Sequence, residues 1–502
     1  MNFCKSLLFL VSLLISSLGI SQVYVGEVIH GDRFQYAKIT ITDSLTTFSL
    51  PYVDNDKKYV VAENIQTTPD WRVIRDLESW VFTTAISSNK LIGTLWDNGI
   101  SQPVTFYRQL DALPINELSK YEGVFEDNNG NRAVVYAENG YLHIMSPYTG
   151  RTMSLKPIGN QRFWSVSGEQ SVFKTTDTDE LTELEITGRF QNVKILKKLP
   201  PMKIEETWVP VGKDSLYAKI FIPPTDQKVP ACLVLPGGGA TGMANYEYEA
   251  RFFAAYGMVA MVFDKSGNGK SKGPGNFNLQ TFEDKSAQYL QLFEFLQNQV
   301  NVDPTKVGVH GPSEGGRLAL MMAIDEPEIA FVNATAAPIT SMREGQLFAI
   351  NEHLRNRGIP EADNIPIRTI WNEYYAGIIA GEIDPKTIEK ANVFREKYDR
   401  LFLPPNAVAL PASPNKDDLL NDRVAIQAAK IRCAVFLQYG ENDGRVPADK
   451  SIQNFYKYVS KDVPITLKIY RRANHSFMTP EYEISHGYTK DKRLWLQKIG
   501  IL

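Results

Sequence analysis

The segment Lys306–Leu320, KVGVHGPSEGGRLAL, decides how the C-terminal part of this chain is expected to fold. Its apolar start at 307–309 predicts a short buried strand, and the residues from Arg317 onward predict a helix. Between them lies a Gly-x-Ser-x-Gly motif centred on Ser313. A serine on a sharp strand-to-helix turn presents its hydroxyl, and glycines at 311 and 315 let neighbouring backbone approach. Ser313 is therefore the candidate nucleophile.

Strand and helix patterns alternate on both sides of this turn from about residue 204 onward. An antiparallel pair of strands is expected first, and then parallel strands that are separated by helices, which predicts an α/β fold with a mostly parallel sheet. The expected strands are 205–211, 216–222, 231–235, 258–263, 307–310, 331–334, 433–439 and 465–470, and the expected helices start near 245 and cover 281–298 and 314–324.

The alternation stops between about 340 and 428, where helical patterns and a Pro-rich stretch, Leu403–Pro414, replace it. An insertion of this length between two sheet strands is too long for a bare loop. It predicts a helical cap over the C-terminal edge of the sheet. Its aromatic side chains belong either to the core of the cap or to the wall of a pocket, and they include Phe348, Trp371, Tyr374 and Tyr375.

A serine nucleophile needs a base and an acid that orients the base. His475, in ANHSF, directly follows the last predicted strand, so it belongs at the sheet edge where Ser313 lies. The other five histidines fall in the β-rich region, on the nucleophile's own strand, in the cap and in the C-terminal tail, at His30, His143, His310, His353 and His486.

The orienting acid is expected in GENDGRVP, the loop after the strand at 433–439. Asp443 is the predicted acid, and Glu441 is its rival two residues away. The resulting order Ser313, Asp443, His475 is the order in which such a triad occurs on an α/β-hydrolase sheet.

An oxyanion hole requires backbone N–H groups that point at the developing negative charge. The residue after the nucleophile, Glu314, is expected to supply one donor. The glycines of LPGGG, at 237–239, let a second backbone segment approach, and Gly238 is the predicted second donor.

These motifs together resemble a known family. Residues from about 204 to 502 are similar to an α/β-hydrolase of the bacterial carboxylesterase group in LPGGG, VFDKSGNGKSKG, HGPSEGG, GENDGRVP and ANHSF. The resemblance implies an eight-stranded sheet in the order 1-2-4-3-5-6-7-8 and ester hydrolysis without a cofactor or a metal. Ser266 and Pro236 depart from the pattern, because such enzymes often have arginine and histidine there, and both changes bear on the pocket.

Two cysteines remain after the predicted signal peptide, Cys232 and Cys433, and both lie in predicted strands. The implied sheet order separates them by three strands at about 4.8 Å per step. That distance is too long for a disulfide, so free thiols are expected. Two cysteines and scattered histidines predict no metal site.

Residues 22–198 are β-rich, with alternating runs and turn signals such as Asn129-Gly130 and Asn139-Gly140. They predict an all-β domain, either as two modules at 22–112 and 119–198 or as parts of one barrel-like unit. The second part resembles, in pattern only, the lipocalin-like β-domains attached to some bacterial serine hydrolases. Leu199-Pro200-Pro201 is the predicted linker to the catalytic domain, 204–502.

The N-terminus has a lysine followed by an apolar run and small residues, which predicts a signal peptide over 1–21. The alternative is a membrane anchor, although the run is shorter than the ~20 residues that a spanning helix needs. The prediction is an exported protein, periplasmic or extracellular, with no membrane span after cleavage.

Composition and motifs weigh against other classes of function. The formal net charge of −3 provides no basic surface for nucleic acid. The run 237–242 matches G-x-G-x-x-G, a dinucleotide-binding pattern with Asp264 after the next strand, but that reading leaves the three triad residues unexplained. The prediction is a secreted serine carboxylesterase for a small-molecule ester. A peptidase and a non-catalytic binding protein are the alternatives, and the oligomeric state is open.

Overall fold

The computed structural model describes most of the chain from residue 21 to residue 502. The described residues are 21–30, 33–50, 58–61, 70–75, 78–87, 89–97, 100–138, 140–188, 191–212, 214–239, 241–272, 280–398, 401–407, 416–479 and 484–502. All but the last residue of the predicted signal peptide lie outside them. Two compact units divide the chain, and their main boundary falls between Leu199 and Pro200.

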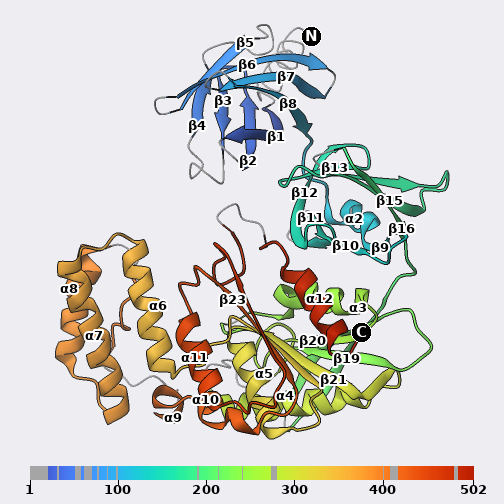
Figure 1. Ribbon diagram of the computed structural model, residues 1–502. Helices are drawn as coiled ribbons and strands as arrows, with labels where there is room; N and C mark the ends of the chain where they lie inside the picture. The colour runs from blue at the N-terminus through green and yellow to red at the C-terminus, as the bar shows by residue number, and fades with distance from the viewer. Residues whose placement is uncertain are drawn as a thin grey trace, which may run out of the picture. The chain divides into compact units, whose positions relative to one another are not determined.

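The first unit begins with an antiparallel eight-stranded sheet, shown in blue shades in Figure 1, in the order β4-β3-β2-β1-β8-β7-β6-β5. Its buried side is rich in aromatic side chains, and the rings of Trp71 and Phe82 stack with centroids 4.0 Å apart. The strands are β1 (Gln22–His30), β2 (Arg33–Ile41), β3 (Thr46–Ser49), β4 (Lys58–Val61), β5 (Asp70–Arg75), β6 (Glu78–Ser87), β7 (Lys90–Asp97) and β8 (Ile100–Gln109).

The same unit continues with α2 (Ile115–Leu118), η1 (Ser119–Tyr121) and a closed β-barrel. Gly130 has a φ of 72° in the turn between β9 and β10, a conformation that glycine tolerates and that the Asn-Gly signal predicted. The barrel strands are β9 (Gly123–Glu126), β10 (Arg132–Glu138), β11 (Tyr141–Ser146), β12 (Arg151–Gly159), β13 (Arg162–Ser165), β14 (Gln170–Thr175), β15 (Leu181–Thr187) and β16 (Val193–Lys198).

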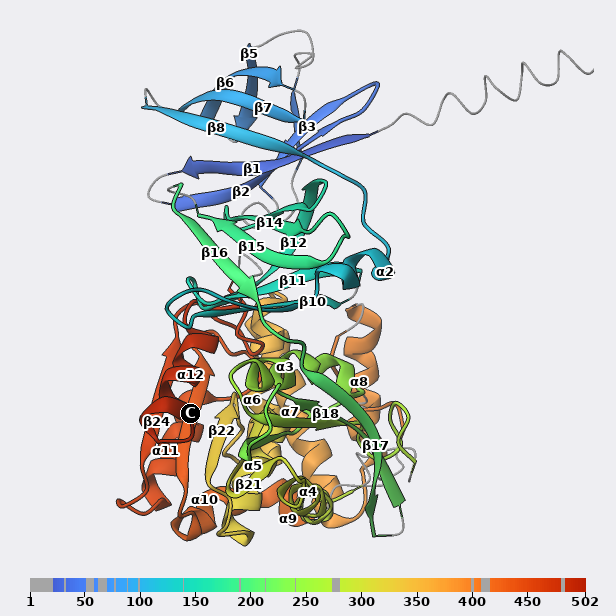
Figure 2. The ribbon, with the colours of Figure 1, turned by 90° about the vertical axis from the view of Figure 1, so that its right-hand side faces the viewer.

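The second unit is built on an eight-stranded sheet in the order β17-β18-β20-β19-β21-β22-β23-β24, with β17 and β24 at opposite edges (Figure 2). This is the order that the resemblance implied. The sheet is mixed, because the pairs β17–β18 and β18–β20 are antiparallel and the pairs from β20 to β24 are parallel. The strands are β17 (Lys203–Val211), β18 (Asp214–Ile222), β19 (Val229–Val234), β20 (Val259–Phe263), β21 (Val302–Pro312), β22 (Phe331–Thr335), β23 (Ala434–Gly440) and β24 (Ile465–Tyr470).

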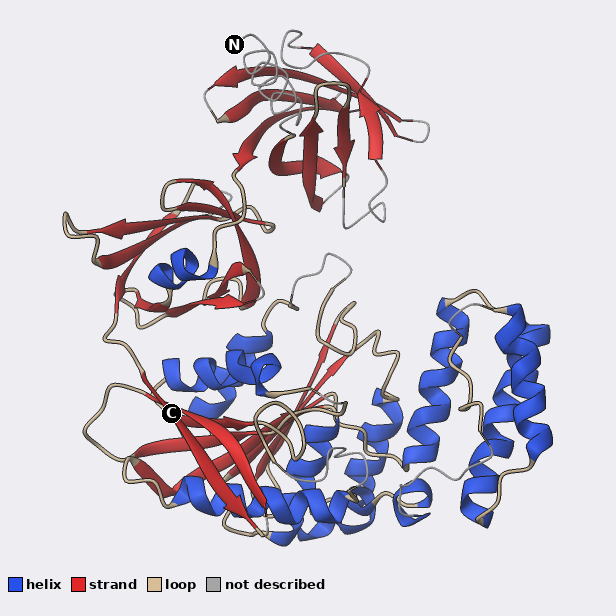
Figure 3. Ribbon diagram, turned by 180° about the vertical axis from the view of Figure 1, so that it is seen from behind, coloured by secondary structure: helices blue, strands red, loops and turns tan. Residues whose placement is uncertain are grey.

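Helices cover both faces of this sheet (Figure 3). They are η2 (Met243–Tyr246), α3 (Glu247–Ala255), α4 (Phe282–Gln297), α5 (Glu314–Asp325), α11 (Ala448–Tyr458) and α12 (Tyr488–Lys498). A reciprocal capping box between Thr281 and Asp284 starts α4. No helix was predicted at α11 or α12. The buried face of α12 includes the polar Thr489 and Lys492, which weakens its apolar period. No helix among the described residues combines the length and apolarity needed to cross a bilayer.

A group of helices between β22 and β23 has a hydrophobic core of its own. It consists of α6 (Met342–Asn356), α7 (Glu361–Ala380), α8 (Pro385–Lys397) and α9 (Lys416–Leu420), and it is followed by α10 (Arg423–Gln427) and η4 (Ala428–Lys430). Trp371, Tyr374 and Tyr375 are buried in that core. These three aromatic residues therefore hold the helical group together, which was one of the two roles expected for them.

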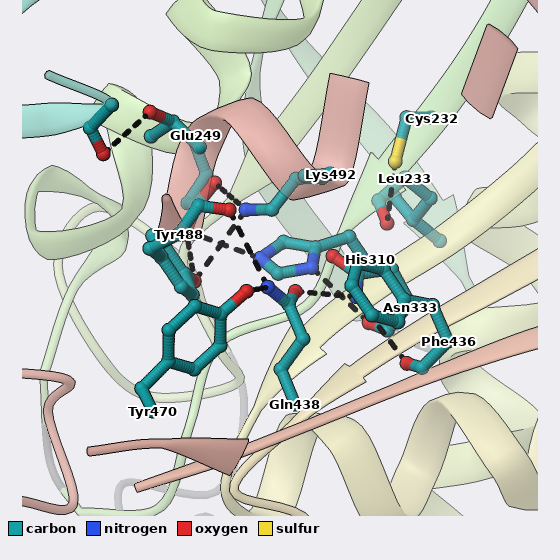
Figure 4. A network of polar contacts seen from close by, with 12 residues as sticks. Cys232, Leu233, Glu249, His310, Asn333, Phe436, Gln438, Tyr470, Tyr488 and Lys492 are labelled. Carbon is teal, nitrogen blue, oxygen red and sulfur yellow. Dashed lines mark hydrogen bonds and ion pairs between the residues drawn. The ribbon is translucent and has the colours of Figure 1, made fainter. Parts of the chain in front are cut away.

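A fully buried ion pair joins helices α3 and α12 (Figure 4). Lys492 of α12 binds the carboxylate of Glu249 of α3, and both side chains are almost inaccessible to solvent. Tyr488 donates its hydroxyl to Glu249 at 2.7 Å, and His310 of β21 places Nε2 3.4 Å from the same carboxylate. The pair thus connects two helices to the strand that carries the nucleophile.

The two cysteines are free. Cys232 lies on β19 and Cys433 directly precedes β23, which is three positions away in the sheet. Burial raises the pKa of the Cys433 thiol to about 12 and raises that of Cys232 as well, so both thiols are protonated at neutral pH.

Candidate active site

Ser313 occupies a strained turn between β21 and α5. Its φ of 54° and ψ of −120° place it outside the regions that L-residues usually adopt. The turn depends on glycine, because a Cβ on Gly311 would lie 2.4 Å from the backbone carbonyl of Gly315. A Cβ on Gly315 would lie 2.7 Å from the carbonyl oxygen of Pro236. The local sequence therefore builds the elbow that it predicted around the serine.

The structure brings the three predicted residues into one hydrogen-bonded chain. His475 Nε2 lies 3.1 Å from Ser313 Oγ, and His475 Nδ1 lies 2.8 Å from Asp443 Oδ2. Ser313 follows β21, Asp443 follows β23 and His475 follows β24. All three strands run parallel in the sheet, so their carboxyl ends meet at one edge.

Asp443 has both carboxylate oxygens engaged. Its Oδ1 accepts the backbone N–H groups of Arg445 at 2.8 Å and Val446 at 2.9 Å, which leaves Oδ2 for His475. The rival acid Glu441 instead accepts the backbone N–H of Arg472 at 2.8 Å. The geometry therefore places Asp443, and not Glu441, beside the histidine.

The loops that carry Asp443 and His475 are packed against each other. Asn442 donates its backbone N–H to the carbonyl of Ala473 at 2.8 Å. Gly440 allows this approach, because a Cβ there would lie 2.4 Å from the carbonyl oxygen of Asn474. The distance between the acid and the base is thus set by backbone contacts as well as by their own hydrogen bond.

The glycine loop after β19 lies beside the nucleophile. A Cβ built on Gly237 would approach the Ser313 Cβ to 3.8 Å, and one built on Gly238 would lie 3.7 Å from the Glu314 Cβ. Both backbone segments that were predicted to form an oxyanion hole are therefore adjacent. The carboxylate of Glu314 lies beside the same loop: Oε2 would be 3.5 Å from a Cβ on Gly238, and Oε1 pairs with the buried Lys285 at 2.8 Å.

Two further residues, Asp264 and Lys265, bind the glycine loop, and the sequence analysis did not assign them this role. Asp264 Oδ1 accepts the backbone N–H of Met243 at 2.7 Å, and Oδ2 accepts that of Lys270 at 2.8 Å. Lys265 Nζ donates to the carbonyl oxygens of Gly237, at 2.8 Å, and Gly239. Both residues belong to the VFDKSGNGKSKG motif, so the sequence contained a signal for them. Which backbone atoms they bind depends on the tertiary structure.

These contacts also explain the dinucleotide-like pattern. In that reading the carboxylate of Asp264 binds a ribose, but here both its oxygens bind backbone N–H groups of its own unit. The glycine at 242 is needed because a Cβ would lie 2.8 Å from Asp264 Oδ1. The pattern therefore builds a loop and leaves no free carboxylate for a cofactor.

His310 and His353 do not join the chain of hydrogen bonds at Ser313. His310 is buried, its Nδ1 lies 3.1 Å from the carbonyl oxygen of Asn333, and burial beside Lys492 lowers its pKa. His353 lies on α6, where burial and then the charges of Arg357 and Arg445 lower its pKa. Within the described ranges, no group of three histidine, cysteine or acidic residues is arranged to hold a metal ion.

Comparison with protein families identifies the family of this chain. The model of the family described as "Serine aminopeptidase, S33" matches residues 227–481, slightly more than half of the 502 residues. The chain belongs to the serine aminopeptidase S33 family. The matched range contains Ser313, Asp443 and His475, and also the helical group α6–α9. This S33 member is therefore a hydrolase with the α/β-hydrolase fold.

Curated relatives match shorter stretches of this S33 hydrolase. The thiohydrolase apmlB of Arthrinium phaeospermum is 28% identical over 127 residues, which are 25% of this chain and 41% of that protein. Dipeptidyl peptidase 8 of Mus musculus is 28% identical over 138 residues, 25% of this chain and 16% of that protein. The match thus covers less than half the length of either relative.

Solved structures resemble the S33 hydrolase over about three fifths of its length. An α/β hydrolase, GrgF, from Penicillium sp. sh18 has a TM-score of 0.39 and 14% identity, and covers 60% of this chain and 98% of its own. A proline iminopeptidase from Mycobacterium smegmatis has a TM-score of 0.38 and 19% identity, and the match covers 59% of this chain and 98% of that protein. Acetyl xylan esterase 1 from Thermoanaerobacterium sp. JW/SL YS485 has a TM-score of 0.36 and 18% identity, and the match covers 60% of this chain and 89% of that protein.

Proposed function

We propose that this hydrolase cleaves carboxylic ester bonds of small molecules through an acyl-enzyme on Ser313. The observation that carries the proposal is the unbroken chain Ser313 Oγ, His475, Asp443, with 3.1 Å and 2.8 Å between successive partners. A serine hydroxyl is a weak nucleophile, and a histidine at this distance removes its proton as the oxygen attacks.

In the first half of the reaction, Ser313 Oγ attacks the ester carbonyl and His475 Nε2 takes the hydroxyl proton. Asp443 accepts the Nδ1 proton of His475, which keeps Nε2 free as the acceptor and stabilises the imidazolium that forms. The backbone N–H groups of Gly238 and Glu314 donate to the oxyanion. The imidazolium then protonates the departing alcohol, and the carbonyl reforms as the Ser313 ester.

In the second half, His475 removes a proton from water, and the resulting hydroxide attacks the acyl-enzyme. The same two N–H donors hold the second oxyanion. Collapse of this intermediate releases the carboxylic acid and returns the proton to Ser313 Oγ. Every proton transfer in this scheme uses His475, so the scheme needs neither a cofactor nor a metal.

The proposal also includes the subgroup of the enzyme, the type of its β-barrel and its localisation. The five motifs quoted above support a member of the bacterial carboxylesterase group, and the β-barrel of β9–β16 is proposed as a lipocalin-like attachment. The apolar N-terminal run supports export to the periplasm or the exterior after cleavage behind Ser21.

The decisive experiment is turnover of p-nitrophenyl acetate and longer p-nitrophenyl esters by the purified protein and by Ser313→Ala. The proposal expects turnover by the wild type and loss of at least ~10³-fold in the variant. Equal rates for the two proteins, or no ester turnover by the wild type at any chain length, would contradict it.

Aminopeptidase activity is the second candidate, and the description of the matching family favours it. The same triad attacks an amide as well as an ester, so only the substrate decides between the two. The purified protein is assayed with aminoacyl p-nitroanilides beside the p-nitrophenyl esters. Anilide turnover that depends on Ser313 in the absence of ester turnover would replace the first proposal with the second.

A further inference from the structure

Lys265 is a buried cation that contacts two backbone oxygens of the glycine loop. It directly follows Asp264 after β20, and only 1% of its surface is exposed. Its ammonium donates to the carbonyl oxygen of Gly237 at 2.8 Å and to that of Gly239. Burying a lysine is costly, and here the charge binds two carbonyl oxygens of the glycine loop.

The contact with Gly237 has a direct consequence for the neighbouring N–H. The carbonyl of Gly237 and the N–H of Gly238 belong to one peptide group, which is planar and trans. In such a group the C=O and N–H bonds point in opposite directions. By holding the carbonyl of Gly237, Lys265 therefore fixes the direction of the Gly238 N–H, which is the proposed oxyanion donor.

The charge of Lys265 also strengthens that donor. A cation on the carbonyl oxygen polarises the peptide, and hydrogen bonds in series reinforce one another at low dielectric. Glycines 237–239 have no side chains of their own to hold them, and glycine has the least restricted backbone of any residue. Loss of the lysine would therefore release one restraint on the Gly238 peptide.

Asp264 secures the far end of the same loop. Its carboxylate binds the N–H of Met243 at 2.7 Å and that of Lys270 at 2.8 Å. The two consecutive residues after β20 thus bracket the loop from 237 to 243, and the lysine is the one that reaches the proposed oxyanion peptide.

We propose that Lys265 is a positioning residue for ester hydrolysis, which aims the Gly238 N–H at the oxyanion by holding the carbonyl of Gly237. The inference rests on the proposed function, because it needs an oxyanion to form beside Ser313. It assigns Lys265 no contact with the substrate and no proton transfer.

Two charged side chains face Lys265, and they make its role testable by pH. Burial lowers the pKa of Lys265 to about 8, the carboxylate of Glu314 on α5 opposes this shift, and the ammonium of Lys285 on α4 adds to it. The ammonium is therefore lost as pH rises through about 8. Transition-state stabilisation, and with it kcat, is expected to fall over that range.

The test uses the full chain with Lys265→Met, Lys265→Arg and a matched control, Lys270→Met, which removes an exposed charge from the same turn. For Lys265→Met, kcat for a p-nitrophenyl ester should fall about 10²-fold, as for a damaged oxyanion hole, with KM nearly unchanged. The fall in kcat above pH 8 should disappear.

Lys265→Arg should recover part of kcat and retain it at high pH, because guanidinium stays charged. Lys270→Met should match the wild type.

A merely structural lysine would lower the melting temperature without changing the pH profile. The inference is overturned if Lys265→Met keeps kcat within about threefold of the wild type, or if it keeps the alkaline decline. If neither Lys265 variant folds, the wild type decides by itself, since a kcat that is flat from pH 7 to 9.5 overturns the inference. Turnover that survives Ser313→Ala defeats the proposed function instead, whereas an inactive Ser313→Ala with an unaffected Lys265→Met defeats only the role of Lys265.

Discussion

At the scale of single residues, the hydrogen bonds of Asp443 determine which tautomer His475 adopts. Two backbone N–H groups, from Arg445 and Val446, fill Oδ1, so that oxygen has to remain an acceptor. Oδ2 is then the atom that faces His475 Nδ1, and it binds the ring in the form with the proton on Nδ1. Nε2 is left free to accept the proton of Ser313.

Asp443→Asn tests this arrangement. The two backbone donors require the amide oxygen at the Oδ1 position, so the amide NH₂ faces His475 and donates to Nδ1. The ring proton then moves to Nε2, which no longer accepts from Ser313. We expect kcat for a p-nitrophenyl ester to fall by about 10⁴-fold with little change in the melting temperature.

The matched control is Glu441→Gln, whose side-chain oxygen still accepts the N–H of Arg472. Its kcat should equal that of the wild type. A large loss in Glu441→Gln combined with full activity in Asp443→Asn would reverse the assignment of the acid.

At the scale of elements, the buried ion pair fixes α3 and α12 against the sheet. Burial by itself opposes ionisation of Glu249, but the charge of Lys492 outweighs it and holds the pKa of Glu249 below its ordinary value. Tyr488 and His310 contact the same carboxylate, so four residues from three elements depend on one charge pair. This pair replaces the apolar contacts that α12 lacks at Thr489 and Lys492.

Lys492→Met should therefore destabilise the second unit strongly. It leaves the carboxylate of Glu249 buried without its cation, and breaking a buried pair in this way costs about 3–5 kcal/mol in the free energy of unfolding. The double variant Glu249→Gln with Lys492→Met removes the unpaired charge and should recover much of the loss. Urea denaturation of the three proteins measures both effects.

Arg355→Met is the surface comparison, because Arg355 pairs with Glu352 on α6 with 66% of its side chain exposed. Exposed pairs contribute about 0–1 kcal/mol, so this variant should unfold nearly as the wild type does. If Lys492→Met is no more destabilising than Arg355→Met, the buried pair does not secure α12.

At the scale of the whole molecule, the chain consists of two units with separate hydrophobic cores. The β-sheet and barrel of the first unit bury their own aromatic and aliphatic side chains, and the second unit contains all the residues of the proposed mechanism. A unit with its own core has the means to fold alone.

We therefore expect residues 200–502, produced alone, to unfold cooperatively and to hydrolyse p-nitrophenyl esters at a rate comparable to that of the full chain. Residues 22–199 should also fold alone, with the circular dichroism of a β-protein and no turnover. A soluble but inactive 200–502 fragment would show that the first unit contributes to the function of the second.

Much of the second unit could be predicted because its signals are local. Strong apolar runs such as those of β19 and β21 and the turn at Ser313 depend on residues close in sequence. The order of the strands was implied by the family resemblance and not by these local signals. The antiparallel edge at β17 and β18 was expected as well. Helices between β22 and β23 were expected from their period, and the structure adds that Trp371, Tyr374 and Tyr375 are part of their core.

The sequence by itself determined the nucleophile's turn, the histidine after the last strand and the glycines that the turn needs, because strand ends and glycine requirements are properties of short segments. Only the tertiary structure decided between Asp443 and Glu441, since the choice depends on which carboxylate meets His475 across a gap of 32 residues. It alone revealed the burial of Lys265 against the Gly237 carbonyl and of Lys492 against Glu249. A buried charge has no sequence signature of its own, because its stability depends on a partner that the fold brings from far along the chain.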